Sequence, residues 1–174
     1  LGIAREDQDF LSALKFIKAS KPKKIVEDYI AIHGKRSHCT NEANEVTVFF
    51  TNPDKSKMNI IVRAYNDGIA FCYEFPDKSG KYIINDEYTA YEINPTAKRW
   101  MEKWTPSNEN LYSTMPDDKV QQEWGYPALF KNQNNDNWLL IHESDVDRNY
   151  CGTKLSNKAS AASLINIAKT RFTI

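Results

Sequence analysis

The stretch that decides the fold is residues 58–75, MNIIVRAYNDGIAFCYEF. Two runs rich in β-branched and aromatic residues flank Asn66-Asp67-Gly68, which predicts a hairpin with a short loop whose glycine takes a positive φ. In the second run, large side chains stand at every second position and therefore share one face of a strand: Ile69, Phe71, Tyr73 and Phe75. We expect this face to be core, because each such side chain stabilises the fold by roughly 1.5–3 kcal/mol when it is buried.

The rest of the chain repeats this pattern of short apolar runs separated by turn residues. Further strands are predicted at 46–50, 82–84, 88–93, 126–131 and 138–143, and the polar segment 132–137 predicts a second hairpin. Residues 34–44, 105–119 and 156–160 are predicted as loops. Many short strands with regular turn signals favour an antiparallel sandwich or barrel, with only a small helical component.

Several segments fit a helix and a strand equally well. In residues 1–20 the apolar side chains recur at helical spacing, although this could equally be a short turn of helix in a linking segment. Residues 161–168 show the same spacing, yet this segment could be a strand. Trp100 and Trp104 are four apart and would share one helical face. Residues 25–32 also fit both periods, and their β-branched content favours a strand.

Length and composition exclude several classes of protein. The 174 residues suffice for one domain with a sizeable core rather than two. The chain has 23 Lys+Arg against 23 Asp+Glu, and a net charge of zero gives no support to nucleic-acid binding. An uninterrupted apolar run of about 18 residues, as a membrane span requires, is absent from the sequence. A chain that starts at Leu1 and stops in the apolar Phe172-Thr173-Ile174 is interpreted as a trimmed piece of a larger, processed protein.

Cysteine and histidine spacing predicts no metal site. Cys39, Cys72 and Cys151 lie far apart, so they fit no zinc pattern, and we interpret them as small buried hydrophobes. His33 and His38 fall in or near a polar loop. His142 and Glu143 are neighbours in an expected strand, so their side chains would point to opposite faces.

The tryptophan and serine residues are candidates for sugar binding and for catalysis, respectively. An indole face stacks well on a sugar ring, so Trp100, Trp104, Trp124 and Trp138 could form a platform, although core packing is the commoner use of such side chains. Two Ser-x-x-Lys spacings, at Ser12 and Ser20, lack the partner motifs of serine enzymes. We therefore interpret both serines as polar surface.

One string resembles a known family. The residues 63–71, RAYNDGIAF, followed by the YEFP of 73–76, are similar to the hairpin of the N-terminal domain of glycoside hydrolase family 97. These are secreted α-glucosidases and α-galactosidases of gut Bacteroides-like bacteria. Residues 34–36 with 44–48, and the later strand 140–143, continue the resemblance, which covers residues ~25 to 155. The sequence departs from the family at Cys72, where a basic residue is common.

The resemblance implies a fold and a role. The fold is an all-β, antiparallel β-supersandwich of the galactose-mutarotase-like kind, a single domain over residues 1–174 that is trimmed at both ends. In the family this domain precedes a catalytic (β/α)₈ barrel that is absent here, so the chain alone would be inactive, periplasmic or secreted. It would pack on the barrel of the same polypeptide and help to complete a site for an α-linked oligosaccharide and calcium. The family's calcium-binding glutamate of this domain maps onto Glu143 in the Ile-His-Glu string.

Two other interpretations compete with a glycosidase domain. The chain could be a free-standing carbohydrate-binding sandwich that uses its tryptophans, or a protein-interaction sandwich without a ligand. Glycan binding that is lost on Trp→Ala changes would favour the first of these two. A barrel encoded directly after Ile174 would favour the glycosidase domain over both.

Overall fold

The computed structural model describes residues 1–77, 82–115, 122–133, 136–146, 152–160, 163–167 and 172–173. Among these residues the regular elements are all β-strands, and every strand pair is antiparallel. The all-β antiparallel prediction is confirmed, whereas the small helical component is not found in this part of the chain. The chain divides into two compact units: unit 1 is Leu1–Leu11 with Gly80–Ile174, and unit 2 is Ser12–Ser79.

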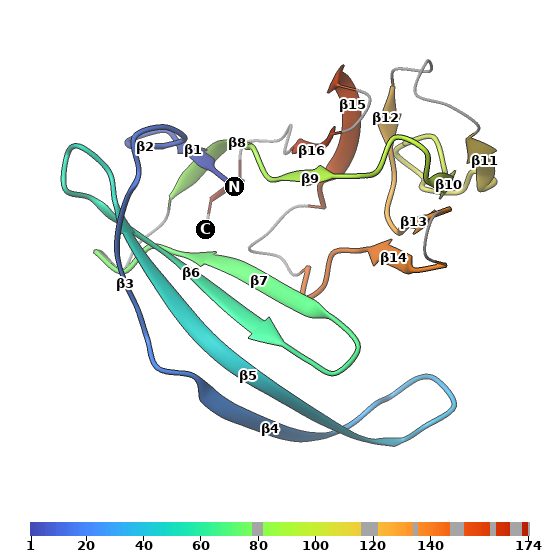
Figure 1. Cartoon of the computed structure of the whole chain (residues 1–174), viewed down its shortest axis with the longest axis horizontal. Helices are drawn as coiled ribbons and strands as arrows, with labels where there is room; N and C mark the ends of the chain where they lie inside the picture. The colour runs from blue at the N-terminus through green and yellow to red at the C-terminus, as the bar shows by residue number, and fades with distance from the viewer. Residues whose placement is uncertain are drawn as a thin grey trace. The chain divides into compact units, whose positions relative to one another are not determined.

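Unit 2 is one five-stranded sheet built around a single long strand (Figure 1). The 14-residue β5 pairs with β6 along one edge and with β3 and then β4 along the other, and β7 pairs with the far edge of β6. Strands that follow one another in the sequence are thus neighbours in space. Their bounds are β3 (Lys15–Ala19), β4 (Lys23–Ile30), β5 (His38–Thr51), β6 (Lys57–Ala64) and β7 (Ile69–Glu74).

The predicted hairpin of residues 58–75 is present, and the predictions for its glycine and for the neighbouring strand β5 each need one correction. The N–H of Tyr65 donates to the carbonyl of Gly68 at 2.8 Å and closes the β6–β7 turn. Gly68 does not adopt a φ in the left-handed region, so the expected backbone reason for glycine there is not realised. Residues 38–44, predicted as loop, belong to β5, because backbone pairing with β4 holds this polar stretch extended.

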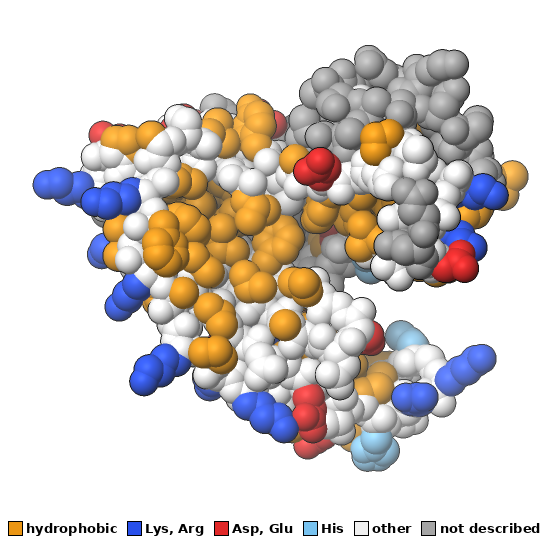
Figure 2. Space-filling model, in the orientation of Figure 1, with side chains coloured by type: hydrophobic (Ala, Val, Ile, Leu, Met, Phe, Trp, Pro, Cys, Tyr) orange, Lys and Arg blue, Asp and Glu red, His pale blue; other side chains and the backbone are white. Residues whose placement is uncertain are grey.

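The apolar face of β7 is less buried than predicted. Phe71 and Tyr73 are only partly buried, with their rings edge to face at 6.1 Å, and Ile69 is 77% exposed. Cys72, expected to be buried, is exposed on the opposite face of this strand. The reason is position, since β7 pairs on one side only and forms the edge of the sheet. Hydrophobic side chains accordingly remain visible over this sheet in the space-filling view (Figure 2).

Unit 1 contains three four-stranded sheets made of short strands. The first has the order β17-β8-β1-β2, the second β12-β15-β16-β9 and the third β11-β10-β13-β14 (Figure 1). Most neighbours are far apart in the sequence. The bounds are β1 (Ile3–Arg5), β2 (Asp9–Phe10), β8 (Ile83–Glu87), β9 (Ala90–Glu92), β10 (Lys98–Met101), β11 (Ser113–Met115), β12 (Glu123–Trp124), β13 (Ala128–Lys131), β14 (Trp138–Ile141), β15 (Lys154–Ser160), β16 (Ser163–Ile167) and β17 (Phe172–Thr173).

These strands settle the segments that the sequence left open. Within 1–20 the regular elements are the strands β1, β2 and β3 in place of the expected helix, and residues 163–167 form β16. Trp100 lies in β10, so its helical spacing from Trp104 is not realised. The predicted loop 156–160 is wrong, because these residues continue β15, and the predicted loop 105–119 contains the short β11. The second hairpin is confirmed: β13 pairs with β14, and Asn132 N–H donates to the carbonyl of Asn137 at 2.9 Å.

The core of unit 1 lies on the inner face of the β10-β13-β14 ladder and beside β12 and β15. Along β13 the burial alternates, with Ala128 and Phe130 buried and their neighbours Leu129 and Lys131 only partly so. The described residues contain no helix long and apolar enough to cross a membrane. The core cluster comprises Ile93, Ala97, Met101, Trp124, Tyr126, Ala128, Phe130, Ile141 and Leu155.

Candidate functional site

A cavity of about 410 Å³ lies in unit 1 and is the candidate functional site. It is lined by residues 104–106, 108, 125–126, 142–146 and 152–153, which come from four separate parts of the chain. Its wall mixes aromatic rings with hydroxyl, amide and carboxylate groups. Such a lining suits a polar ligand with apolar faces.

Two of these segments are joined by backbone pairing. The N–H of Trp104 donates to the carbonyl of Glu123, and the N–H of Gly125 donates to the carbonyl of Glu102, both at 3.0 Å. Gly125 fits tightly, since a Cβ added there would lie 2.8 Å from a side-chain oxygen of Asn108 and from one of Glu102. A larger residue here would have to displace the ends of the Asn108 and Glu102 side chains, so glycine lets these groups approach closely in this wall of the cavity.

Glu143 is held in the cavity wall by Thr153. The Glu143 Oε1 accepts hydrogen bonds from the Thr153 backbone N–H at 3.0 Å and from the Thr153 hydroxyl at 2.5 Å, and Oε2 lies 3.2 Å from the same N–H. Thr153 itself is 6% exposed. The carboxylate thus has a fixed position, with its remaining lone pairs able to accept further bonds or bind a cation.

Two tyrosines lie close to this carboxylate. Tyr126 is in the cavity wall and is 8% exposed. Burial raises its pKa, a side-chain hydrogen bond with Thr153 lowers it, and the charges of Tyr91, Glu143 and Glu87 raise it further. Burial also raises the pKa of Tyr91, with Glu87 and Glu143 acting in the same direction. Both phenols therefore have pKa values above the ordinary pKa of tyrosine.

The indole of Trp104 is fixed by a buried ion pair. The ammonium of Lys154 lies 3.9 Å from the Trp104 ring centroid and donates to Glu123 Oε2 at 2.7 Å. The Lys154 and Glu123 side chains are 9% and 18% exposed, so this pair is shielded from water. Trp104 therefore meets the cavity as a preorganised aromatic surface.

The carboxylate groups in the cavity wall are of the kind that binds calcium. Glu143 and Asp145 both line it, and calcium prefers hard oxygen ligands such as carboxylates. In the part of the chain that the structure describes, no group of three or more His, Cys, Asp or Glu side chains could hold a metal ion. Since calcium takes about 6–8 oxygen ligands, these residues could contribute to a site and could not complete one.

Strand alternation does not govern the positions of His142 and Glu143. β14 ends at Ile141, so both residues lie beyond the strand, and both line the same cavity. The predicted strand over 138–143 thus ends earlier, at Ile141, and strand alternation does not apply to this pair. His33 and His38 lie in unit 2 and are exposed.

The four tryptophans do not form one platform. Trp124 is a core residue, 2% exposed, and its Nε1–H donates to Asn157 at 3.2 Å. Trp104 lines the cavity, whereas Trp100 and Trp138 stack on each other elsewhere in unit 1. Cys39, expected to be buried, is partly exposed, and Cys151 lies outside the described residues.

Sequence reasoning missed most of the cavity. Thr153, Tyr126 and Asn108 stand in no motif, and only the fold brings them near Glu143. The one local signal was Gly125, an isolated glycine beside aromatic residues in a chain with 6 glycines. Such a glycine marks close backbone approach without saying to what.

Comparison with known proteins agrees with this fold. The family model described as "Glycosyl-hydrolase 97 N-terminal" matches residues 1–172. The chain belongs to this family. This match confirms the resemblance to the family that the residues of the β6–β7 hairpin indicated. A curated relative named "Probable retaining alpha-galactosidase" from Streptomyces bingchenggensis (strain BCW-1) is 26% identical over 160 residues, which is 91% of this chain and 24% of that protein.

Two solved structures are also similar to this glycosyl-hydrolase 97 N-terminal chain. A beta-arabinopyranosidase is 27% identical with a TM-score of 0.84, and the match covers 97% of this chain and 29% of that one. A family 97 enzyme from Pseudoalteromonas sp. strain K8, in complex with acarbose, is 23% identical with a TM-score of 0.82 over 100% of this chain and 28% of that one. The chain thus spans about a quarter of the length of these relatives, and the matched parts of the two solved structures have the same fold as this chain.

Proposed function

We propose that this chain is the non-catalytic N-terminal domain of a secreted or periplasmic glycosidase that acts on α-linked oligosaccharides. The observation that carries the proposal is the cavity with Glu143 clamped in its wall, in a chain that matches the family over residues 1–172. In this proposal the catalytic barrel of the same polypeptide packs against the cavity and supplies the catalytic acids. The chain alone is then inactive.

The sugar would meet the aromatic part of the cavity. Trp104 presents an indole fixed by Lys154, and Tyr126 lies in the same wall. Sugar rings stack on such surfaces through their C–H groups, while the surrounding amide, hydroxyl and carboxylate groups bind hydroxyls. Relatives named for galactosidase and arabinopyranosidase activity, and a family 97 enzyme solved with panose, support a carbohydrate as the ligand.

Glu143 would contribute oxygen to a calcium ion that the barrel completes. Its carboxylate is positioned by Thr153 and retains accepting capacity, and Asp145 adds a second carboxylate to the wall. Calcium, when bound, supplies a fixed positive charge that polarises the bound sugar or its leaving group. This chain's own part is to hold the carboxylate in place.

The test is calcium titration of the full polypeptide, wild type against Glu143→Gln, together with hydrolysis of aryl α-glucoside, α-galactoside and β-arabinopyranoside. Loss of one charged ligand should weaken calcium binding by roughly tenfold or more and lower turnover. Glu92→Gln, an exposed acid of β9 outside the cavity lining, is the matched control and should bind calcium normally. Unchanged calcium affinity and rate in Glu143→Gln would refute the role of Glu143.

A further inference from the structure

The outer face of the sheet β11-β10-β13-β14 carries large apolar side chains that the core does not use. Strand register sets Trp100 opposite Leu129, and Leu129 opposite Leu140, on this face. Leu140 is 59% exposed and Trp138 is 55% exposed. An antiparallel sheet with one face in water normally carries polar residues there, so this composition points to a surface with a ligand.

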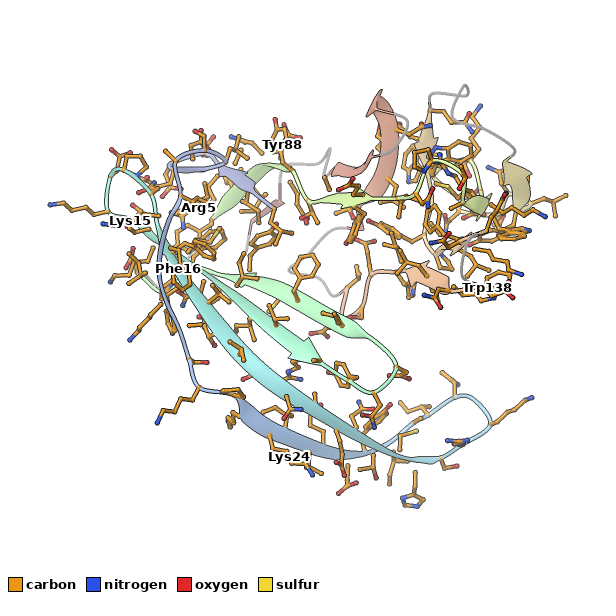
Figure 3. The ribbon with its side chains drawn as sticks, in the orientation of Figure 1. Arg5, Lys15, Phe16, Lys24, Tyr88 and Trp138 are labelled. Atoms are coloured by element: carbon orange, nitrogen blue, oxygen red, sulfur yellow. The ribbon has the colours of Figure 1, made fainter. Side chains whose placement is uncertain are left out.

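Two indoles on this face are already arranged as a platform. The rings of Trp100 and Trp138 stack with centroids 5.4 Å apart and an interplanar angle of 28°. Figure 3 shows Trp138 projecting from β14 among the side chains of this sheet. Because each ring restricts the other, the aromatic surface loses little conformational entropy when a ligand covers it.

A donor and an acceptor lie at the edge of this platform. The ammonium of Lys131, directly across from Trp138 in the strand register, is 5.3 Å from the centroid of the Trp138 ring. It pairs with Asp136 at 2.8 Å, and the Asp136 side chain is 87% exposed. The pair therefore offers both an N–H donor and carboxylate acceptors beside an aromatic face.

This combination selects among ligand classes. A sugar ring has an apolar C–H face for the indole, and its hydroxyls both donate and accept hydrogen bonds. A nucleic acid or an anionic lipid surface needs a field of positive charge, whereas Lys131 is neutralised by Asp136 and the chain as a whole has zero net charge. The chemistry of the face therefore fits a neutral carbohydrate.

We propose that Trp138, Trp100, Lys131 and Asp136 form a surface binding site for a neutral polysaccharide of pyranose units. None of these residues lines the cavity that contains Glu143. The site would hold a polymer on the protein independently of what the cavity binds. It thus goes beyond the proposed function and does not depend on calcium.

The experiment is native gel electrophoresis of the full polypeptide through gels that contain soluble amylopectin, galactomannan or arabinogalactan. The wild-type protein should be retarded by at least one polymer. Trp138→Ala should weaken that affinity by roughly tenfold, since removing the stacking surface loses contact area and aromatic attraction together. Lys131→Met keeps an aliphatic side chain of similar length and should weaken binding to a smaller extent.

Two further variants separate the surface from other causes. Tyr88→Ala removes an aromatic side chain of unit 1 that is 47% exposed and lies away from this sheet in Figure 3, and it should leave the retardation unchanged. Trp104→Ala alters the cavity. Retardation lost with Trp138→Ala and kept with Trp104→Ala supports the surface site even if Glu143 binds no calcium.

The opposite results overturn the proposal. Retardation lost with Trp104→Ala and kept with Trp138→Ala would place polymer binding in the cavity and leave the proposed function standing. Absence of retardation by all three polymers, or an equal loss with Tyr88→Ala, would show that the outer face binds no glycan. Circular dichroism of each variant confirms that the fold is retained before the gels are compared.

Discussion

Unit 2 and unit 1 differ in how far apart along the chain their paired strands lie. In unit 2, β5, β6 and β7 follow one another and pair in that order. In unit 1, Ala90 of β9 pairs with Ile165 of β16, and Glu123 of β12 pairs with Ser156 of β15. Because its strands pair locally, unit 2 can be predicted from the sequence. Unit 1 and its cavity are built by pairing between distant segments.

The two units also differ in how completely they bury their apolar side chains. The described core cluster lies in unit 1, where Trp124 is 2% exposed and has its N–H satisfied by Asn157. In unit 2 the aromatic residues of β7 are only half-buried. Stability and site geometry should therefore depend more strongly on single residues in unit 1.

The largest expected effect tests this difference directly. Trp124→Ala should lower the free energy of unfolding by about 3–5 kcal/mol, because it leaves a large cavity and removes the indole N–H that donates to Asn157. Phe71→Ala, the matched aromatic deletion in unit 2, should cost about 1–2 kcal/mol, since a half-buried ring loses only part of the burial energy. Denaturant unfolding followed by circular dichroism measures both. Equal losses would show that the two units are equally well packed.

Fold class could be predicted from the sequence because alternation and turn residues are local signals. The strands at 46–50, 58–65 and 69–75, and the second hairpin at 132–137, all came from such signals. The predicted loop 38–44 failed because β4 holds it extended through backbone bonds that leave no apolar pattern. The burial of Ile69 failed because alternation shows which side chains share a face and cannot show whether that face is covered.

The candidate site could be predicted only in one residue. Glu143 came from a short string that resembles the family, while Thr153, Tyr126 and Trp104 are brought to it by the pairing of distant segments. No spacing rule links residues 104, 126 and 153, because the strands between them must first find their partners. Prediction from sequence therefore ends where the long-range topology of unit 1 begins.

The second effect concerns alkaline pH and again separates the units. Tyr126 and Tyr91 of unit 1 have pKa values raised above the ordinary tyrosine value of about 10, and burial is the first cause in both. A raised folded-state pKa means that stability is fully present below the unfolded value and is lost as pH rises above it. For Tyr126 the loss should be about 1.4 kcal/mol per pH unit above pH ~10, as the unfolded chain ionises first, and Tyr91 should add to it in the same direction.

Unfolding free energies at pH 9, 10 and 11 (each about one unit apart around the reference pKa) measure this loss. Tyr126→Phe should reduce the slope, because it removes a phenol that ionises in the unfolded chain while burial keeps it neutral in the folded chain. Tyr29 of unit 2 also has a raised pKa, but its main cause is a side-chain hydrogen bond with Cys39 and the ring is 48% exposed, so Tyr29→Phe should reduce the slope less than Tyr126→Phe does. A slope that does not respond to Tyr126→Phe would contradict the burial of this phenol.

The third effect sharpens the role of the cavity, which only unit 1 provides. On the proposal that Glu143 binds calcium, Thr153→Val removes the hydroxyl that holds the carboxylate while keeping its backbone N–H and its shape. Calcium affinity of the full polypeptide should fall by roughly tenfold, as expected when a residue that orients a ligand is lost. Thr153→Ser keeps the hydroxyl and should restore most of the affinity. Equal affinities in Thr153→Val and wild type would show that the clamp does not matter for the ion.

The smallest effect lies on the exposed surface of unit 2. Arg63 of β6 bonds to Glu45 of β5 at 2.7 Å and to Glu27 of β4 at 3.1 Å, so one guanidinium links three strands. The hydrogen bond to Glu45 is the main cause that raises its pKa, and the group remains charged at every practical pH. The side chains of Arg63, Glu45 and Glu27 are 34%, 20% and 45% exposed, which leaves both ion pairs open to water and salt. Arg63→Met should therefore cost less than ~1 kcal/mol, and about 1 M salt should remove most of the difference from wild type. A loss above ~3 kcal/mol that persists in salt would mean that the three strands depend on Arg63 as a buried network would, and the contrast drawn between the two units would have to be given up.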